Sequence, residues 1–176
     1  MEISESLKKF ITENLYLINE NTKESWEKIY NNRFFYLIGE FTKMILDAGI
    51  NDPAAVIGYI PQYYLYHESK IKHYSIPSNV VSIGKEAFYN CSSLTSIVIP
   101  DSITSIGEHA FYGCNSLTNI VLPNSLINIS SSAFSYCPKL KNIVIPDSVI
   151  SIGNYAFSGC DSLISIEIPD SLTTIG

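Results

Sequence analysis

The chain has 176 residues, of which 46% are hydrophobic, and it carries a net charge of −6 at pH 7. This length and apolar content suffice for one or two small units with a continuous core. The acidic balance argues against a nucleic-acid partner, because binding to phosphates requires a basic stripe on the surface.

The first ten residues, MEISESLKKF, mix charged and apolar side chains and form no uninterrupted apolar region. A secretory signal needs such a region, so we expect a cytoplasmic protein, with a virion as a further possible location. The most apolar stretch, residues 34–50, is interrupted by Glu40, Lys43 and Asp47, which are costly at a bilayer centre. It is predicted to be an amphipathic helix, and no membrane partner is expected.

Residues 1–70 are predicted to form a helical N-terminal segment. The apolar positions of three helices are Leu7, Phe10, Ile11, Leu15 and Ile18, then Trp26, Ile29 and Tyr30, then Phe34, Phe35, Leu37, Ile38, Phe41, Ile45 and Leu46. The third helix is expected to end at Gly49. Asp52 followed by Pro53 is typical of a helix cap with proline at the first helical position.

Two interpretations of this helical segment are open. An apolar-faced helical pack directly before a repeat array can shield the first repeat from water, which makes the segment a cap. Alternatively, the segment is a separate recognition or assembly module. The support for that alternative is a group of tyrosines, namely Tyr59, Tyr63, Tyr64 and Tyr66.

From residue 71 onward the sequence repeats itself every 23 residues. Three independent columns of identical residues keep this interval: Pro77, Pro100, Pro123, Pro146 and Pro169; Cys91, Cys114, Cys137 and Cys160; and Phe88, Phe111, Phe134 and Phe157. Columns that share one register indicate a stack of similar coils, each of which buries its apolar residues against the next.

Each repeat is predicted to be one coil with a strand on one side. Alternation in Ile97-Val98-Ile99 points the two isoleucines one way and the valine the other, and Pro100 ends the strand because it lacks an N–H donor. Parallel strands about 4.8 Å apart are therefore expected at residues 73–77, 96–100, 119–123, 142–146 and 165–169. A second apolar pair closes another side of the coil, and the Ala-Phe pair fits a short turn that fills the interior. The predicted fold class is an α+β repeat solenoid over residues 71–176 with a parallel β-sheet, preceded by an α-helical N-terminal cap.

The repeated unit resembles the BspA-like class of leucine-rich repeats. The pattern Leu-x-x-Ile-x-Ile-Pro, then Val-or-Leu-x-x-Ile-Gly, then Ala-Phe-x-x-Cys carries the resemblance over residues 71–176, with departures at Ser130 and Pro138. The resemblance implies an elongated, curved binding scaffold, often on adhesins and surface antigens and sometimes in viral or phage proteins, and it implies no reaction. A pairing of short helices with such repeats is, by the same resemblance, common in proteins of phages and mobile elements.

The residues that could carry chemistry favour a structural interpretation. The four cysteines occur once per coil, whereas metal-binding cysteines come in close pairs such as C-x-x-C. They are predicted to be a buried column of free thiols, which fits a reducing compartment. His67, His73 and His109 lie in separate contexts, and no nucleophile, phosphate-binding or zinc motif is found. We therefore expect no catalytic residue, no metal and no cofactor.

The outward side of the predicted strands is the candidate partner-binding surface. Its residues are Val98, Val121, Val144 and Glu167, with Asn119 and Asn142 beside them. Stacked valines facing solvent form an apolar stripe, and such patches often mark contacts; the alternative is that β-branched residues simply favour strands. A second outward column is open to the same two interpretations: Val81, Thr104, Ile127, Ile150 and Thr173.

The last coil stops at Gly176, before its Ala-Phe pair and cysteine. An uncovered solenoid end exposes apolar residues and strand edges. The uncovered end has three possible explanations. The chain is truncated, the final partial coil is itself a tolerable cap, or two copies meet end to end. The hypothesis of a homodimer rests on Ile166, Ile168, Leu172 and Ile175.

These features together predict a non-enzymatic protein–protein interaction module, acting as an inhibitor or assembly factor on a host protein. The alternative function is a structural or adhesive component of a surface or virion.

Overall fold

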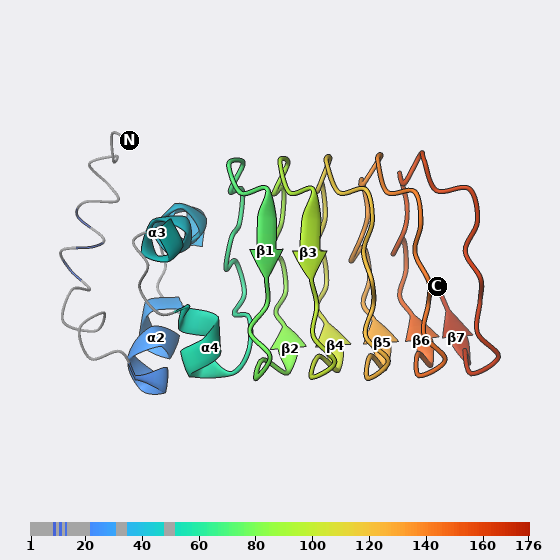
Figure 1. Cartoon of the computed structure of the whole chain (residues 1–176), viewed down its shortest axis with the longest axis horizontal. Helices are drawn as coiled ribbons and strands as arrows, with labels where there is room; N and C mark the ends of the chain where they lie inside the picture. The colour runs from blue at the N-terminus through green and yellow to red at the C-terminus, as the bar shows by residue number, and fades with distance from the viewer. Residues whose placement is uncertain (1–8, 10, 12, 14–21, 31–34, 48–51) are drawn as a thin grey trace.

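The computed structural model describes residues 9, 11, 13, 22–30, 35–47 and 52–176. Helices lie at one end of an elongated molecule, and the coils follow in a single row towards the C-terminus (Figure 1). The helices are α2 (Lys23–Tyr30), α3 (Phe35–Asp47) and α4 (Pro53–Ile57). The strands are β1 (His73–Ser75), β2 (Ser82–Ile83), β3 (Ser96–Val98), β4 (Ser105–Ile106), β5 (Asn128–Ile129), β6 (Ser151–Ile152) and β7 (Thr174–Ile175).

The second and third predicted helices are confirmed as α2 and α3. Thr22 starts α2 with a reciprocal pair of bonds, in which the Thr22 N–H donates to Ser25 Oγ and the Ser25 N–H donates to Thr22 Oγ1. The first predicted helix lies outside the described residues apart from Ile11, which packs against the core, and Gly49 also lies outside them. No helix in the described part of the chain is long and apolar enough to cross a membrane.

The predicted cap at residues 52 and 53 is confirmed in α4. Asp52 Oδ1 accepts a hydrogen bond from the Ala54 N–H at 2.8 Å, and Pro53 takes the first helical position, where its missing N–H costs nothing. Gly58 ends the helix with a φ of +86°, a conformation that L residues with side chains rarely adopt.

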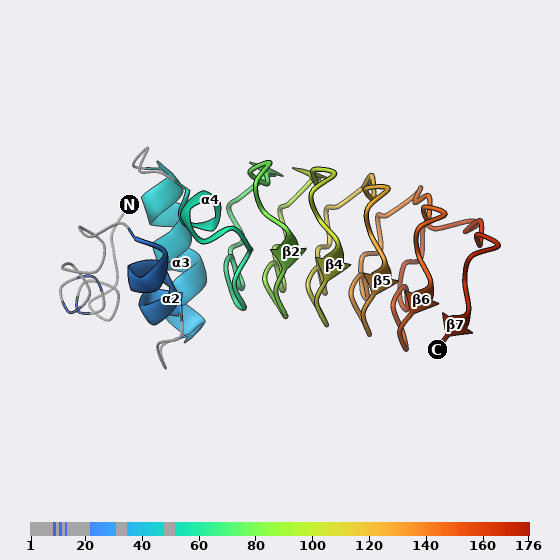
Figure 2. The same cartoon turned by 90° about the horizontal axis from the view of Figure 1, so that it is seen from below.

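The coils are joined by parallel pairing on two sides. One side carries a two-stranded sheet, β1-β3, and the other a five-stranded sheet, β2-β4-β5-β6-β7, which Figure 2 shows running along the row of coils. Paired residues are 23 positions apart, as in Ser82 with Ser105. The chain is therefore a solenoid of stacked coils with parallel strands.

The predicted placement of the main sheet is partly wrong. Strands predicted at 73–77 and 96–100 occur in shortened form as β1 and β3, but those predicted at 119–123, 142–146 and 165–169 are not formed, and an isolated bridge joins Asn119 to Asn142. The proline at the end of each segment explains the shortening, because it donates nothing to the ladder. The continuous sheet lies instead on the side that was expected only to close the coil.

The core is a column of side chains that repeats from coil to coil. Phe88, Phe111, Phe134 and Phe157 stack with ring centroids 5.1, 5.3 and 5.6 Å apart and interplanar angles of 2°. This spacing lies in the range that favours offset stacking of aromatic rings. The first three rings are fully buried, so the inward placement of the phenylalanine column is confirmed.

The coil pattern also reaches residues that the sequence analysis assigned to the helical segment. Ile60 forms a parallel bridge with Ile83, 23 positions later. Tyr63 and His67 have φ angles of 63° and 57°, which match the positive φ angles at the equivalent positions of the next coil. Residues 58–67 thus trace part of a coil directly after α4.

Tyrosines join the helices to the first coils. The Tyr30 ring lies 5.5 Å from the Tyr64 ring, and Tyr64 lies 6.5 Å from Phe88. The hydroxyls of Tyr64 and Tyr74 both donate to the carboxylate of Asp52, the latter at 2.7 Å. Burial raises the pKa of the Tyr64 hydroxyl, which keeps it protonated and able to donate. The helical and coiled parts therefore share one core.

Candidate partner-binding surface

The predicted valine column faces solvent. Val98, Val121 and Val144 are 61%, 80% and 70% exposed, and Glu167 is exposed as well. Ile97, which precedes Val98 in β3, is buried, as the alternation in the sequence predicted. We call Val98, Val121 and Val144 the valine column.

A pocket of about 360 Å³ opens between two neighbours of the valine column. Val121 and Val144 line it, together with Asn119 and Asn142, whose side chains are joined by a bond of 3.4 Å from Asn142 Nδ2 to Asn119 Oδ1. Buried isoleucines of the same two coils, Ile120 and Ile143, also contribute. The structure thus brings four of the six predicted contact residues to one pocket, with Val98 one coil away.

The pocket lies on the side of the coils that carries the Asn119–Asn142 bridge. Beyond that bridge, residues 120–123 form no ladder with residues 143–146, whereas the same two coils pair on their other side through β5 and β6. The pocket therefore combines apolar side chains with the side-chain amides of Asn119 and Asn142.

The second outward column is also exposed. Val81, Ile127 and Ile150 face solvent, while Thr104 and Thr173 use their hydroxyls to bond to the preceding coil, Thr173 Oγ1 donating to the Ile150 carbonyl at 2.9 Å. The pocket at Val121 and Val144 is lined by none of these residues, so the valine column is the better candidate.

The residues predicted for a homodimer lie on the last described coil. Ile168 and Ile175 are exposed, whereas Ile166 and Leu172 pack partly against the core. All four continue columns that point inward in the earlier coils. Their part in an interface between copies stays a prediction.

The four cysteines are confirmed as buried free thiols. Each Sγ donates to a carbonyl of the preceding coil, at 3.0 Å from Cys91 to Leu65 and at 3.3 Å from Cys114 to Phe88. Burial raises the pKa of both thiols, which keeps them as neutral donors. The column links coils and offers no thiolate for chemistry.

We expect these thiols to be protected in the folded chain. Modification by Ellman's reagent at neutral pH should be at least about a hundredfold slower than in the denatured chain, because it requires a local opening that costs about 3 kcal/mol. Cys160, which is the least buried, should react first. Rapid reaction of all four thiols in the native chain would contradict the buried column.

The histidines lie apart from one another. His73 Nδ1 bonds to Ser96 Oγ at 2.7 Å, and His109 Nδ1 lies 3.7 Å from a carboxylate oxygen of Glu108. Among the described residues, no three His, Cys, Asp or Glu side chains are grouped so that they could hold a metal ion.

A row of surface tyrosines was missed by the sequence analysis. Tyr66, Tyr89 and Tyr112 stack with centroids 5.0 and 4.8 Å apart, and Tyr136 adds a tilted ring at 5.2 Å. The interval of 23 residues between the first three was the signal that could have found them. Because their faces cover one another, the row presents ring edges rather than open faces, and we assign it to coil packing.

Comparison with family models gives one match. Residues 58–176 match the model of the BspA type leucine-rich repeat region, in six copies. The match begins at the residue where the structure shows the coil pattern to start. No curated protein matches the chain.

Solved structures of bacterial proteins are similar to the chain. A leucine-rich cell surface protein from Faecalibacterium prausnitzii A2-165 is 37% identical with a TM-score of 0.61, and the match covers 64% of this chain and 30% of that one. The leucine-rich repeat protein of T. pallidum is 27% identical with a TM-score of 0.59, covering 68% and 67%. The pneumococcal vaccine antigen PcpA is 26% identical with a TM-score of 0.55, covering 66% and 32%. The chain thus spans about a third of the length of the first and third of these proteins.

Proposed function

This chain belongs to the BspA-type leucine-rich repeat family, and we propose that it is a protein-binding module whose contact surface is the valine column with its pocket. Leucine-rich repeats of this family suit protein–protein interaction or surface adhesion and are generally non-enzymatic. The observation that carries the proposal is the pocket between Val121 and Val144, flanked by two asparagines. A binding module acts by occupying its partner's surface, which is how an inhibitor or assembly factor of a host protein works.

The physical basis is a rigid surface with apolar and polar parts. The valines are held at fixed spacing by the coils, so little conformational entropy is lost when a partner binds. An apolar side chain of the partner gains from leaving water in the pocket. The Asn119 and Asn142 amides supply hydrogen bonds that fix its orientation.

The test replaces both pocket valines with aspartate. We expect Val121→Asp with Val144→Asp to lower partner recovery about tenfold or more, because each buried carboxylate would need a counter-ion in the interface. Recovery from a lysate of the source organism is measured by quantitative mass spectrometry against the unchanged chain.

The matched control is Ile127→Asp with Ile150→Asp. These two exposed residues lie in the same coils on the other outward column, so the control adds the same charge without touching the pocket. Equal loss with both double variants would overturn the valine column as the contact surface. Unchanged recovery with both would direct attention to residues 1–70.

The helical segment is proposed to cap the solenoid. The contacts of Tyr30 and Tyr64 and the bonds to Asp52 support this role, because they place helical residues against the first coils. The division into residues 1–70 and 71–176 remains a proposal. The bridge at Ile60 favours a boundary near residue 58.

A second candidate function is surface adhesion. The observation that favours it is the similarity to the F. prausnitzii cell surface protein. A virion component and a cytoplasmic protein are the other proposed settings, the latter supported by the unbridged thiols. A homodimer through the last coil is proposed on the exposure of Ile168 and Ile175 alone. Protease treatment of intact cells that removes the protein would favour the surface.

A further inference from the structure

The pocket at Val121 and Val144 lies beside a row of acidic turn residues. Asn124, which lines the pocket, is the first turn residue after the proline of its coil. The same position of the repeat holds Asp101 in the coil before, Asp147 in the coil after and Asp170 in the coil beyond. We call Asp101, Asp147 and Asp170 the aspartate edge.

The carboxylates of the aspartate edge are exposed and unpaired. All three residues are exposed, and none of their side chains forms an ion pair or a hydrogen bond within the described residues. Neighbouring coils lie about 4.8 Å apart, so Asp101 and Asp147 are separated by about 10 Å. That is no more than the Debye length of about 10 Å at 0.1 M salt, so their attraction for a cation adds up.

The opposite edge of the valine column carries less charge. Its residues are Thr95, Thr118 and Lys141, one from each coil, and Lys139 lies two positions before the last. In the last described coil, Glu167 takes the place of the valine and is exposed. The column and its two edges therefore hold four carboxylates against two lysines, and the negative charge favours a basic partner.

The pocket itself offers an apolar floor. Ile120, Leu122 and Ile143 line it and are buried, and its volume of about 360 Å³ has room for one large apolar side chain. Asp147 follows Val144 by three residues, so its backbone lies within about 10 Å of the pocket wall. A partner with an apolar residue in the pocket reaches the aspartate edge with a residue one or two positions away.

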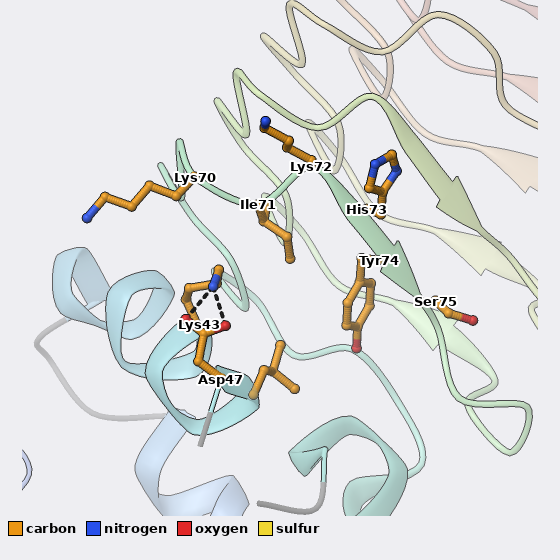
Figure 3. A pocket seen from close by; sticks show the side chains of 9 residues that line it. Lys43, Asp47, Lys70, Ile71, Lys72, His73, Tyr74 and Ser75 are labelled. Carbon is orange, nitrogen blue, oxygen red and sulfur yellow. Dashed lines mark hydrogen bonds and ion pairs between the residues drawn. The ribbon is translucent and has the colours of Figure 1, made fainter. Parts of the chain in front are cut away.

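The coil nearest the helices lacks both the valine and the aspartate. Ser75 pairs in register with Val98 and takes the valine position, and Ser78 takes the aspartate position. A pocket of about 450 Å³ lies there between α3 and β1 (Figure 3), with Lys43, Asp47 and Lys72 in its lining. The only carboxylate that lines this pocket, that of Asp47, is already paired with Lys43. A basic segment is therefore favoured only on the coils of the valine column.

We propose that the valine column binds a basic and apolar segment of a protein partner. An aliphatic or aromatic side chain enters the pocket at Val121 and Val144, and lysine or arginine residues one or two positions away lie over the aspartate edge. This inference rests on the proposed function, because it gives the chemistry of the partner for the same surface. Exposed ion pairs contribute little singly, so recognition requires the apolar contact and the charges together.

The probe is a fluorescein-labelled peptide, Gly-Arg-Leu-Arg-Leu-Arg-Gly, titrated with the full chain and followed by fluorescence anisotropy. We expect Asp101→Asn with Asp147→Asn to weaken binding about fivefold, because two exposed ion pairs are lost. Val121→Thr with Val144→Thr keeps the charge and nearly the shape of the pocket, and it should weaken binding about as much through the lost apolar contact. Peptides with serine in place of leucine, or glutamate in place of arginine, should bind at least about tenfold more weakly.

The matched control is Glu86→Gln with Glu108→Gln. These two residues follow strands of the other sheet, β2 and β4, and lie near Lys85, so the net charge changes equally but away from the column. Equal weakening by the aspartate and glutamate double variants overturns the inference. Binding of the serine or the glutamate peptide as strong as that of the original also overturns it, and so does a lack of binding up to about 1 mM protein.

Partner recovery separates this inference from the proposed function. A fall in recovery with Asp101→Asn and Asp147→Asn, matched by weaker peptide binding, supports a basic partner. Loss of recovery with Val121→Asp and Val144→Asp, together with unchanged recovery for the asparagine double variant, overturns the basic partner and leaves the contact surface in place. Unchanged recovery with both double variants overturns the contact surface itself.

Discussion

Phe111→Ala should lower the free energy of unfolding by about 3–5 kcal/mol, because it removes a fully buried ring and leaves a cavity. Phe111 stacks between Phe88 at 5.1 Å and Phe134 at 5.3 Å, so both neighbours lose a packed face. Small folded proteins are stable by roughly 5–15 kcal/mol, and this one change thus removes a large share. Urea unfolding followed by circular dichroism measures the loss.

Tyr112→Ala is the matched control for this prediction. Tyr112 is the next residue, belongs to the surface row and stacks on Tyr89 at 4.8 Å, but it is only partly buried. Its loss should cost about 1–2 kcal/mol. A greater loss from Tyr112→Ala than from Phe111→Ala would show that the surface row, and not the core, holds the coils together.

Asp52→Ala should cost about 3 kcal/mol, because one carboxylate caps α4 and accepts from two tyrosine hydroxyls. The Ala54 N–H, Tyr64 and Tyr74 all lose their acceptor. Tyr64 is fully buried, so its hydroxyl would be left without water to replace the bond. The helical segment should therefore separate from the coils at lower denaturant than in the unchanged chain.

Hydrogen exchange measured by mass spectrometry locates this effect. Protection should fall in α4 and in the first coils and remain in the coils that contain Phe134 and Cys137. Asp101→Ala is the control, since Asp101 is an exposed turn residue between β3 and β4. Uniform loss of protection along the whole solenoid would contradict a junction held by Asp52.

The columns of the solenoid were predictable because burial and periodicity coincide. A phenylalanine or cysteine every 23 residues can only share an environment if the coils stack, and the structure confirms that environment. The cap at Asp52 and Pro53 was predictable from two adjacent residues, because capping is a local interaction.

The placement of the main sheet was not predictable from the same pattern. Apolar alternation marks both sides of the coil, and it does not tell which side completes a hydrogen-bonded ladder. Proline stops the segments that look most like strands, while the short pair at Ser105 and Ile106 continues its ladder through every coil to β7.

Of the candidate sites, one was predictable from the sequence and one was not. Val121 and Val144 were found because outward residues alternate with inward ones along a segment. The pocket between α3 and β1 was not found, because the residues that line it, such as Lys43 and Lys72, are distant in sequence and line one pocket only when α3 packs beside β1. Contacts between a helical segment and a repeat do not recur at a fixed interval, so the sequence contains no repeated pattern from which they could be predicted.

Because the register between neighbouring coils is constant, the length of the solenoid can change only in steps of one coil. Each coil bonds to the one before it through the same groups, such as the cysteine thiol and a backbone carbonyl 26 residues earlier. Loss or gain of one 23-residue block rejoins equivalent positions and leaves every other column aligned. The distance between the N-terminal helices and the pocket at Val121 and Val144 can therefore change by whole coils, while the residues that line the pocket stay the same.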